Sequence, residues 1–320
     1  MTKTVLLTGA FGNIGAHVLS HLLAAEHRVT CLDLENDKTR KAAQALGDRV
    51  RVVWGDLREP QTLARGLEGV DAVIHMAAII PPLSERNPQF ATAVNVDATA
   101  GLIDAMEASS TAKRLVFASS MGVAGLEQHR RQPPLTVDLP PSPSDHYGQT
   151  KARCEELIRA SGLQWSILRI AACPPLEPSK DISQISVIFE TTADGRTEFV
   201  HMDDAGLAFA NAVDCYAAIG RILFIGGGTR CQTRALPFYN ELLGAMGLGP
   251  LRAAKFRPGP TYFFGDWLDT RESQELLQYQ RHTLEDFFAA MRRHVGPKRH
   301  LLRLVAPLAN RYIEKHSPYG

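Results

Sequence analysis

Two residues with complementary acid–base chemistry, Tyr147 and Lys151, lie four positions apart near the middle of the chain. The segment from Asp145 opens a helical pattern that continues to Ile158, so the two side chains share one helix face. A lysine ammonium beside a phenol favours the phenolate and should lower the phenol pKa from about 10 toward neutrality. The pair therefore predicts an acid/base group able to give or take a carbonyl proton near pH 7. The alternative is an ordinary surface pair.

A glycine-rich turn near the N-terminus separates a predicted strand from a predicted helix. The apolar run 4–7 is typical of a strand buried on both faces, and apolar residues after the turn recur at helical spacing. Glycine tolerates positive φ and lets a diphosphate approach the backbone, where the positive end of the helix can hold it. The turn thus predicts dinucleotide binding, and the alternative is a tight strand-to-helix turn. The residues expected to contact the cofactor are Gly9, Phe11, Gly12, Asn13, Ile14 and Gly15.

An acid, Asp33, ends the second predicted strand 18 residues after Gly15, and Glu35 follows it. In dinucleotide folds an acid about 20 residues past the glycines accepts hydrogen bonds from the adenosine ribose. Two carboxylates there would repel a 2′-phosphate, which favours NAD over NADP as the cofactor. The alternative for Asp33 is an exposed loop acid.

Strand-like and helix-like segments alternate through the first 170 residues, the pattern of an α/β doubly wound parallel sheet, or Rossmann-like fold. In this arrangement ligands bind at the carboxyl ends of the strands. The fourth predicted strand, 71–78, ends there on Met76, Ala77 and Ala78, which leave room for a cofactor. We expect His75, inside this apolar strand, to be a packed core residue. A long helix is predicted at 90–108 and a proline-rich loop at 128–144.

The composition of the chain limits the classes of partner and cellular compartment that we expect. The chain of 320 residues is 45% apolar and 22% charged, and its net charge of +1 gives no reason to expect nucleic acid. Its five scattered cysteines fit reduced thiols in a cytoplasmic protein and predict neither a disulfide framework nor a metal site. We expect no signal peptide, and no apolar run approaches the roughly 20 residues needed to cross a bilayer.

These motifs occur in the order found in the extended short-chain dehydrogenase/reductase family, also called the NAD-dependent epimerase/dehydratase family, which the chain resembles. The likeness is specific over residues 3–170 and weaker through the Phe-x-His-x-Asp-Asp segment at 199–204. The motifs that carry it are the turn ending at Gly15, Asp33, the Gly-Asp-Leu at 55–57, the His-Met-Ala-Ala at 75–78, Asn95, the serines 119–120, Tyr147 and Lys151.

The resemblance implies a catalytic set of Ser120, Tyr147 and Lys151. Ser120 matches better than Ser119, since the family's catalytic hydroxyl stands five residues before a glycine, here Gly125. Ser120 would hydrogen-bond the reacting oxygen, Tyr147 would transfer its proton, and Lys151 would hold the nicotinamide ribose and tune the tyrosine. The same resemblance implies that the asparagine at position 95 helps to order the site. It also implies that the residues flanking the adenine are Asp56 and Leu57.

The second half departs from the sugar-nucleotide members of the family. The asparagine and Tyr-Gly pair that those members commonly carry after the sixth strand are absent here, and only some two dozen residues separate Pro175 from Phe199. A short lobe has fewer groups to grip a nucleotide diphosphate, so this segment looks closer to uronate dehydrogenases and other small-substrate members. The residues predicted to line the substrate pocket are Ile80, Ser120, Met121, Tyr147 and Cys173, although packing is the more natural role for Cys173.

We therefore expect an NAD-binding Rossmann domain at 1–172, a small substrate lobe interleaved with late Rossmann elements at 173–296, and a basic amphipathic tail at 297–320. The expected function is an NAD-dependent oxidoreductase that interconverts a hydroxyl and a carbonyl on an alcohol, lactol or sugar-like substrate. One alternative is a nucleotide-sugar epimerase or dehydratase with tightly bound NAD. Another is a non-catalytic NAD-sensing regulator, although such proteins usually lack the tyrosine and lysine.

Two further expectations concern partners. The apolar faces of the helices at 90–108 and 145–160 predict a homodimer, because in the resembling family these helices pair as a four-helix bundle. The tail is basic and amphipathic, with Pro307 expected to break or kink its helix. Its apolar stripe could pack on the protein's own body or on the partner subunit, or it could lie on an anionic membrane surface. The stripe is short and carries no lipidation motif, which favours packing.

Overall fold

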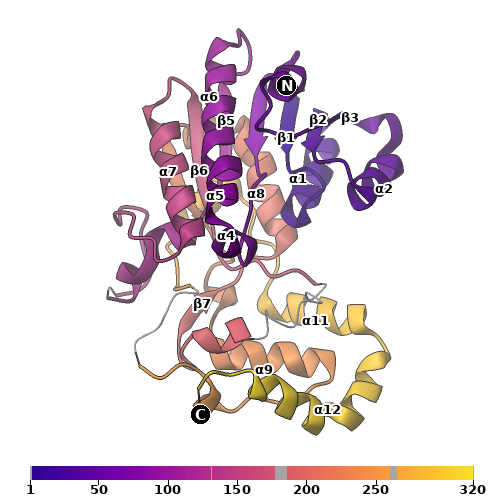
Figure 1. Cartoon of the computed structure of the whole chain (residues 1–320), viewed down its shortest axis with the longest axis vertical. Helices are drawn as coiled ribbons and strands as arrows, with labels where there is room; N and C mark the ends of the chain where they lie inside the picture. The colour runs from indigo at the N-terminus through magenta and orange to yellow at the C-terminus, as the bar shows by residue number, and fades with distance from the viewer. Residues whose placement is uncertain (1, 131, 177–185, 260–264, 320) are drawn as a thin grey trace.

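The computed structural model describes residues 2–130, 132–176, 186–259 and 265–319. Figure 1 shows two parts stacked along the long axis, a helix-flanked sheet that contains the N-terminus and a smaller lobe that contains the C-terminus. The chain crosses between them more than once, so the lobe is interleaved with the last elements of the sheet domain.

Seven parallel strands form the main sheet in the order β3-β2-β1-β4-β5-β6-β8, with the crossover between β1 and β4 that defines a doubly wound fold. Residue 7 of β1 pairs with residue 31 on one side and residue 74 on the other. The strands are β1 (Thr4–Thr8), β2 (Arg28–Asp33), β3 (Arg51–Trp54), β4 (Ala72–His75), β5 (Arg114–Ser120), β6 (Gln164–Ile170) and β8 (Arg221–Ile225).

Helices cover both faces of this sheet, as the continuous apolar strands predict. Leu7 of β1 faces a core that includes Val18 of α1 and Phe209 of α8, whereas the adjacent Leu6 faces a core that includes Leu102 of α6 and Ile158 of α7. The helices of this domain are α1 (Asn13–Ala24), α2 (Asp37–Leu46), α3 (Pro60–Leu67), α4 (Leu83–Arg86), α5 (Pro88–Thr92), α6 (Ala98–Ala108), α7 (His146–Ala160) and α8 (Met202–Asp214). Short 3₁₀ turns lie at Gly47–Arg49, Met121–Arg130 and Tyr216–Ala218.

The helix predicted at 90–108 is continuous, but it contains a π-helical turn. A π-helical turn, Ala93–Asp97, joins α5 to α6 and carries Asn95. Such turns cost regular hydrogen bonding and often occur at functional sites.

The smaller lobe is built around a two-stranded antiparallel ribbon of β7 (Arg196–Glu198) and β9 (Gln232–Arg234). Its helices are α9 (Ala235–Met246), α11 (Leu284–Val295) and α12 (Lys298–Lys315), with 3₁₀ turns at Ser186–Glu190, Thr229–Cys231 and Ala253–Lys255. The short helix α10 (Arg271–Leu277) packs against β8 and α8 of the sheet domain. The proline-rich loop predicted at 128–144 joins this lobe to the sheet domain. Leu135 and Leu139 of the loop are buried, and the Leu135 N–H donates to the Trp267 carbonyl at 2.8 Å.

The C-terminal helix α12 is not broken at Pro307, and much of its apolar stripe is exposed. It continues through Pro307, whose exposed position places the missing backbone hydrogen bond on the solvent side. The expected packing on the chain's own body is found for Ile313 but not for the five exposed side chains of the stripe, while packing on a partner subunit stays a prediction; the five are Leu301, Leu304, Val305, Leu308 and Tyr312. Within the described part of the chain, no helix is long and apolar enough to span a bilayer.

His75 is a buried histidine that links three elements. Its Nδ1 lies 2.7 Å from Thr8 Oγ1 of β1, and its Nε2 lies 2.9 Å from Thr99 Oγ1 of α6. Burial lowers the pKa of His75 to about 3, with a smaller contribution from the positive charge of Lys151. The side chain is therefore neutral in the folded protein, consistent with its predicted role in the core.

This burial predicts an acid-sensitive contribution to stability. Between pH 6.5 and 3 the unfolded state binds a proton at His75 and the folded state does not, so the free energy of unfolding should fall as the pH falls. Relative to His75→Gln, the wild type should lose up to about 2.7 kcal/mol between pH 6.5 and pH 4.5. Urea titrations across this range measure the difference, with the exposed His294→Gln as the matched control. Parallel curves for wild type and His75→Gln would contradict the assignment.

Candidate active site

The glycine turn brings β1 and the start of α1 into contact that side chains would prevent. Gly9 has φ +66°, in the left-handed region that favours glycine, and a Cβ there would lie 3.0 Å from the Ala77 Cα. A Cβ on Gly15 would lie 2.1 Å from the Gly9 carbonyl oxygen. The turn therefore needs these glycines for its own geometry, and it places the first turn of α1 at the β1/β4 crossover.

The N-terminus of α1 has the properties of an anion site. Gly12 occupies the N-cap position and provides no side-chain hydrogen bond to the amides of the first turn. These amides belong to residues 13–15 and point out of the helix at its positive end, the arrangement that holds a dinucleotide diphosphate. The backbone around the turn thus fits the cofactor that the motif predicts.

Asp33 lies at the carboxyl end of β2, beside the turn. Its Oδ2 accepts the Phe11 N–H at 2.9 Å, and its Oδ1 accepts the Leu34 N–H at 2.9 Å. Partial burial raises the pKa of Asp33, and these two hydrogen bonds oppose the rise. Asp33 is therefore part of the turn and not a freely exposed loop acid.

The other predicted cofactor residues line the same edge of the sheet. Met76, Ala77 and Ala78 follow β4 and are half-buried, and the Thr8 Oγ1 accepts the Met76 and Ala77 N–H groups at 3.1 and 3.2 Å. After β3, Leu57 is buried. The neighbouring Asp56 is held by the Arg58 guanidinium, whose hydrogen bonds lower the pKa of its carboxyl.

Tyr147 and Lys151 lie on the face of α7 that is turned toward the sheet. Lys151 is buried, and its Nζ donates to the Ala118 carbonyl of β5 at 2.7 Å. The same Nζ lies 5.8 Å from the centroid of the Tyr147 ring. The phenol is half-buried, and its hydroxyl has no hydrogen-bond partner among the described residues. The pair is thus an internal pair and not a surface one.

The predicted effect of the lysine on the phenol is not found in the protein by itself. Burial raises the pKa of Tyr147 above its ordinary value, because the surroundings disfavour the phenolate. Burial also lowers the pKa of Lys151 to about 8. The ammonium donates to the Ala118 carbonyl and not to the phenol, so the expected shift of Tyr147 toward neutrality was wrong for this state.

The two serines at the end of β5 occupy different surroundings. Ser119 is buried, and its hydroxyl donates to Glu155 Oε1 at 2.5 Å. Ser120 is half-buried, and its Oγ accepts the Gly122 N–H at 3.0 Å, which leaves its hydroxyl proton free to be donated. Of the two, Ser120 is the one whose hydroxyl can reach a substrate oxygen.

Asn95 connects the segment after β4 to α7. Its Oδ1 accepts the Ile79 N–H at 2.7 Å, and its Nδ2 donates to the Ile79 carbonyl at 2.9 Å and to Thr150 Oγ1 at 3.1 Å. The side chain is buried. Its polar atoms therefore form hydrogen bonds within the protein, which makes Asn95 a positioning residue.

Two carboxylates that the sequence did not single out hold α7 in place. Glu85 accepts the His146 and Tyr147 N–H groups, both at 3.0 Å, and so caps the helix at the tyrosine itself. Glu155 forms a buried ion pair with Arg169 of β6, with contacts of 2.7 and 2.9 Å. A signal for the second was present, because an arginine inside an apolar strand needs an acidic partner.

The residues predicted to line a substrate pocket are spread along one side of the site. Ile80 is 56% exposed, whereas Met121 is buried. Cys173 is half-buried and packs against the main core, and burial raises the pKa of its thiol to about 12. This environment agrees with packing for Cys173 and gives it no thiolate character.

Three potential metal ligands, His201, Asp204 and His282, place their ligand atoms within 4.8 Å of one another. Asp204 Oδ2 accepts the N–H groups of Arg281 and His282, both at 2.9 Å, and its Oδ1 lies 2.5 Å from His282 Nδ1. The rings of His201 and His282 stack with centroids 4.2 Å apart. These contacts tie the segment before α11 to the first turn of α8, a structural role for the Phe-x-His-x-Asp-Asp motif.

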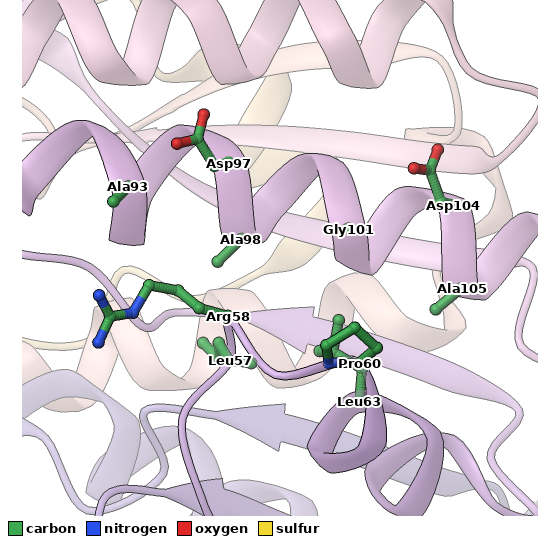
Figure 2. Close-up of a pocket in the computed structure, with 10 residues that line it drawn as sticks. All are labelled: Leu57, Arg58, Pro60, Leu63, Ala93, Asp97, Ala98, Gly101, Asp104 and Ala105. Carbon is green, nitrogen blue, oxygen red and sulfur yellow. The ribbon is translucent and has the colours of Figure 1, made fainter.

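A surface groove lies between α6 and the segment that joins β3 to α3 (Figure 2). Its floor along the helix is made of small residues, and two acids, Asp97 and Asp104, stand on the helix beside it. The small residues of the helix are Ala93, Ala98, Gly101 and Ala105.

The fold and this site define a Rossmann-type dinucleotide-binding protein. Residues 9–194 match the family model described as NAD(P)H-binding. The chain therefore belongs to the NAD(P)H-binding family, in its extended short-chain dehydrogenase/reductase form, and its cofactor is a nicotinamide dinucleotide.

Among curated relatives, UDP-glucose 4-epimerase 4 of Oryza sativa subsp. japonica is 32% identical over 55% of this chain and 50% of its own length. D-erythronate dehydrogenase of Cupriavidus necator is 32% identical over 48% of this chain and 49% of its own length. The chain thus spans about half the length of the curated relatives it matches. A solved structure of a dTDP-glucose 4,6-dehydratase double mutant from Streptomyces venezuelae, with NAD bound, has a TM-score of 0.77 and 26% identity, covering 93% of this chain and 98% of that one.

The position of Asp33 predicts that its charge sets the preference for NAD. Asp33→Asn keeps an oxygen that can accept the Phe11 N–H and removes the charge that repels a 2′-phosphate. We expect NAD affinity to fall about tenfold or more and the affinity for NADP to rise relative to it, as calorimetric titration would show. The matched control is Asp37→Asn, which removes an exposed acid from the first turn of α2. An unchanged NAD:NADP ratio would refute the role of Asp33.

Proposed function

We propose that this protein is an NAD-dependent oxidoreductase that interconverts a hydroxyl and a carbonyl on a small alcohol, lactol or sugar-like substrate. The observation that supports the proposal is the position of Lys151, whose Nζ donates to the Ala118 carbonyl, two residues before Ser120 on β5, and lies 5.8 Å from the centroid of the Tyr147 ring. Bound NAD supplies the acceptor or donor of the hydride.

The side chains of the site would have separate roles in substrate binding, proton transfer and positioning. The free hydroxyl proton of Ser120 would hydrogen-bond the reacting oxygen, and the Tyr147 hydroxyl would take or give the proton of that oxygen. Because burial raises the pKa of Tyr147, the phenolate needs positive charge nearby, which the Lys151 ammonium supplies. Asn95 and Glu85 hold the segments on either side in position.

The lobe supports a small substrate in preference to a nucleotide sugar. A Cβ on Gly265 would lie 3.2 Å from Thr197 Oγ1 and 3.6 Å from Met121 Cε, so β7 passes beside the predicted pocket. The neighbouring cation on β7, Arg196, is engaged with the buried Asp266 through contacts of 2.5 and 2.7 Å. Its charge is therefore neutralised within the protein. The similarity to D-erythronate dehydrogenase agrees with a small polar substrate.

The second candidate is a nucleotide-sugar epimerase or dehydratase, favoured by the likeness to UDP-glucose 4-epimerases. Such an enzyme reduces its own intermediate and produces no net NADH. A panel of alcohols, lactols and uronates with NAD, followed at 340 nm, separates the two because only the dehydrogenase accumulates NADH. Product without NADH from UDP-sugars would select the second candidate, and tight NAD binding without any turnover would select a regulator.

Tyr147→Phe tests the mechanism with the substrate that this panel identifies. The variant removes the proton-transfer group and should lower kcat by about 10³-fold while NAD affinity stays within about twofold. Tyr312→Phe, on exposed α12, serves as the control and should retain full turnover. Full activity of Tyr147→Phe would exclude tyrosine-assisted transfer.

We also propose a cytoplasmic homodimer. The five cysteines are free, which suits a reducing compartment. The apolar side chains of α6 and α7 face the chain's own sheet, so they are not available to form the dimer interface that the sequence predicts. Other features of these helices support the dimer. These features are the small residues that line the groove along α6, which allow close approach, and the opposite charges of Asp97 in the π-helical turn and Arg153 on α7.

Light scattering tests this assembly. At micromolar concentration the mass should be near twice the 35.1 kDa of one chain. Ala105→Arg, which fills the groove, should give a monomer, whereas Gln44→Arg on exposed α2 should not. A monomeric wild type would refute the dimer.

A further inference from the structure

The C-terminal helix α12 is attached to the protein by one face, on which Ile313 packs against the lobe core and two polar side chains form hydrogen bonds. Asn310 Oδ1 accepts the Gly249 N–H at 3.2 Å, and its Nδ2 donates to the Pro250 carbonyl at 3.0 Å. One turn later Glu314, which is buried, accepts the backbone N–H and the guanidinium of Arg252 at 2.8 and 2.7 Å. Ser317 continues this anchoring just after the helix.

The opposite face of α12 is apolar and exposed. Its side chains recur at intervals of three and four residues, so they form one stripe along the helix. Leu304 is 80% exposed, Leu308 73% and Leu301 68%, and Val305 and Tyr312 are about half exposed. The amphipathic helix is thus fixed with its apolar side outward, the reverse of the usual orientation on a globular protein.

The charges around this stripe have a single sign. Lys298 and Lys315 lie at the two ends of the helix on the same side as the stripe, and Arg311 borders it, all three exposed. Glu314 is the single acid between residues 298 and 315, and it is buried against Arg252 on the other side. Arg293 of α11 and His300 border the adjoining hollow at the α11–α12 corner and extend the basic region.

We propose that α12 is a docking surface for an anionic lipid bilayer, on which it lies parallel to the plane of the membrane. Leucine and tyrosine side chains would enter the interface between headgroups and acyl chains, and the lysines and arginine would contact lipid phosphates. Figure 1 places α12 in the smaller lobe, at the end of the molecule opposite the N-terminus.

Charge argues against a second copy of the chain as the occupant. A two-fold axis through the stripe would pair two α12 helices antiparallel and bring Lys298 of each chain toward Lys315 of the other. The single acid of α12, Glu314, is buried on the other side of the helix and cannot compensate that repulsion. An anionic bilayer satisfies both the apolar and the basic parts of the surface.

Vesicle sedimentation with the full chain tests the proposal. The protein should sediment with phosphatidylcholine vesicles that contain phosphatidylglycerol and stay in solution with phosphatidylcholine alone. Binding should weaken in about 1 M salt, where the Debye length is about 3 Å. Leu304→Ser with Leu308→Ser should reduce the affinity at least about tenfold, and neutralising Lys298, Arg311 and Lys315 to glutamine about 100-fold.

The matched controls are Tyr216→Ser, an exposed apolar residue on the sheet domain, and Lys41→Gln on α2. All of these side chains are exposed, so circular dichroism and the melting temperature should stay at wild-type values. The proposal is overturned if the wild type remains in the supernatant with anionic vesicles, or if the stripe variants bind as well as it does. It is equally overturned if the leucine variants instead change the mass in solution, because the stripe then joins copies of the chain.

Discussion

The ion pair between Glu155 and Arg169 sets the position of the whole active-site helix. Tyr147, Lys151 and Glu155 follow one another at intervals of four and form a single stripe on α7. Glu155 is attached to β6 through Arg169 and to β5 through Ser119, and Lys151 is attached to β5 one turn farther along. With two members of the stripe bound to the sheet, the third must lie at the carboxyl edge of the strands. A buried pair of this kind adds little net stability, but the loss of one partner typically costs 3–5 kcal/mol.

Much of the sheet domain could be predicted because its signals are local. The apolar run before Gly9 and the helical spacing after it define a strand–turn–helix without any knowledge of distant residues, and the seven-stranded sheet confirms the fold class. The spacing of Tyr147 and Lys151 likewise places both on one face of a helix. What the spacing could not show is that the lysine donates to the Ala118 carbonyl and that burial raises the pKa of the phenol.

The features that sequence reasoning did not find all depend on contacts between distant residues. Glu85 caps α7 from a short helix 61 residues earlier, and Arg169 requires a partner on a different element. The same reason explains why the orientation of α12 was not predicted. Helical periodicity predicts an apolar stripe, but the contacts of Asn310, Ile313 and Glu314 with the lobe determine which face of the helix meets the protein.

The outward orientation of α12 also separates the requirement for folding from the requirement for contact with a partner. Most hydrophobic residues of a protein are kept by the first requirement. A core leucine is kept by the need to fold, since its loss leaves a cavity. Leu304 and Leu308 contribute almost nothing to the packing of this fold, so polar replacements there carry no folding penalty and mutation would be expected to erode them. In closely related chains, the persistence of apolar residues at these positions would therefore record selection on what the helix touches. The surface is free to be gained or lost in evolution without any change to the enzyme beneath it.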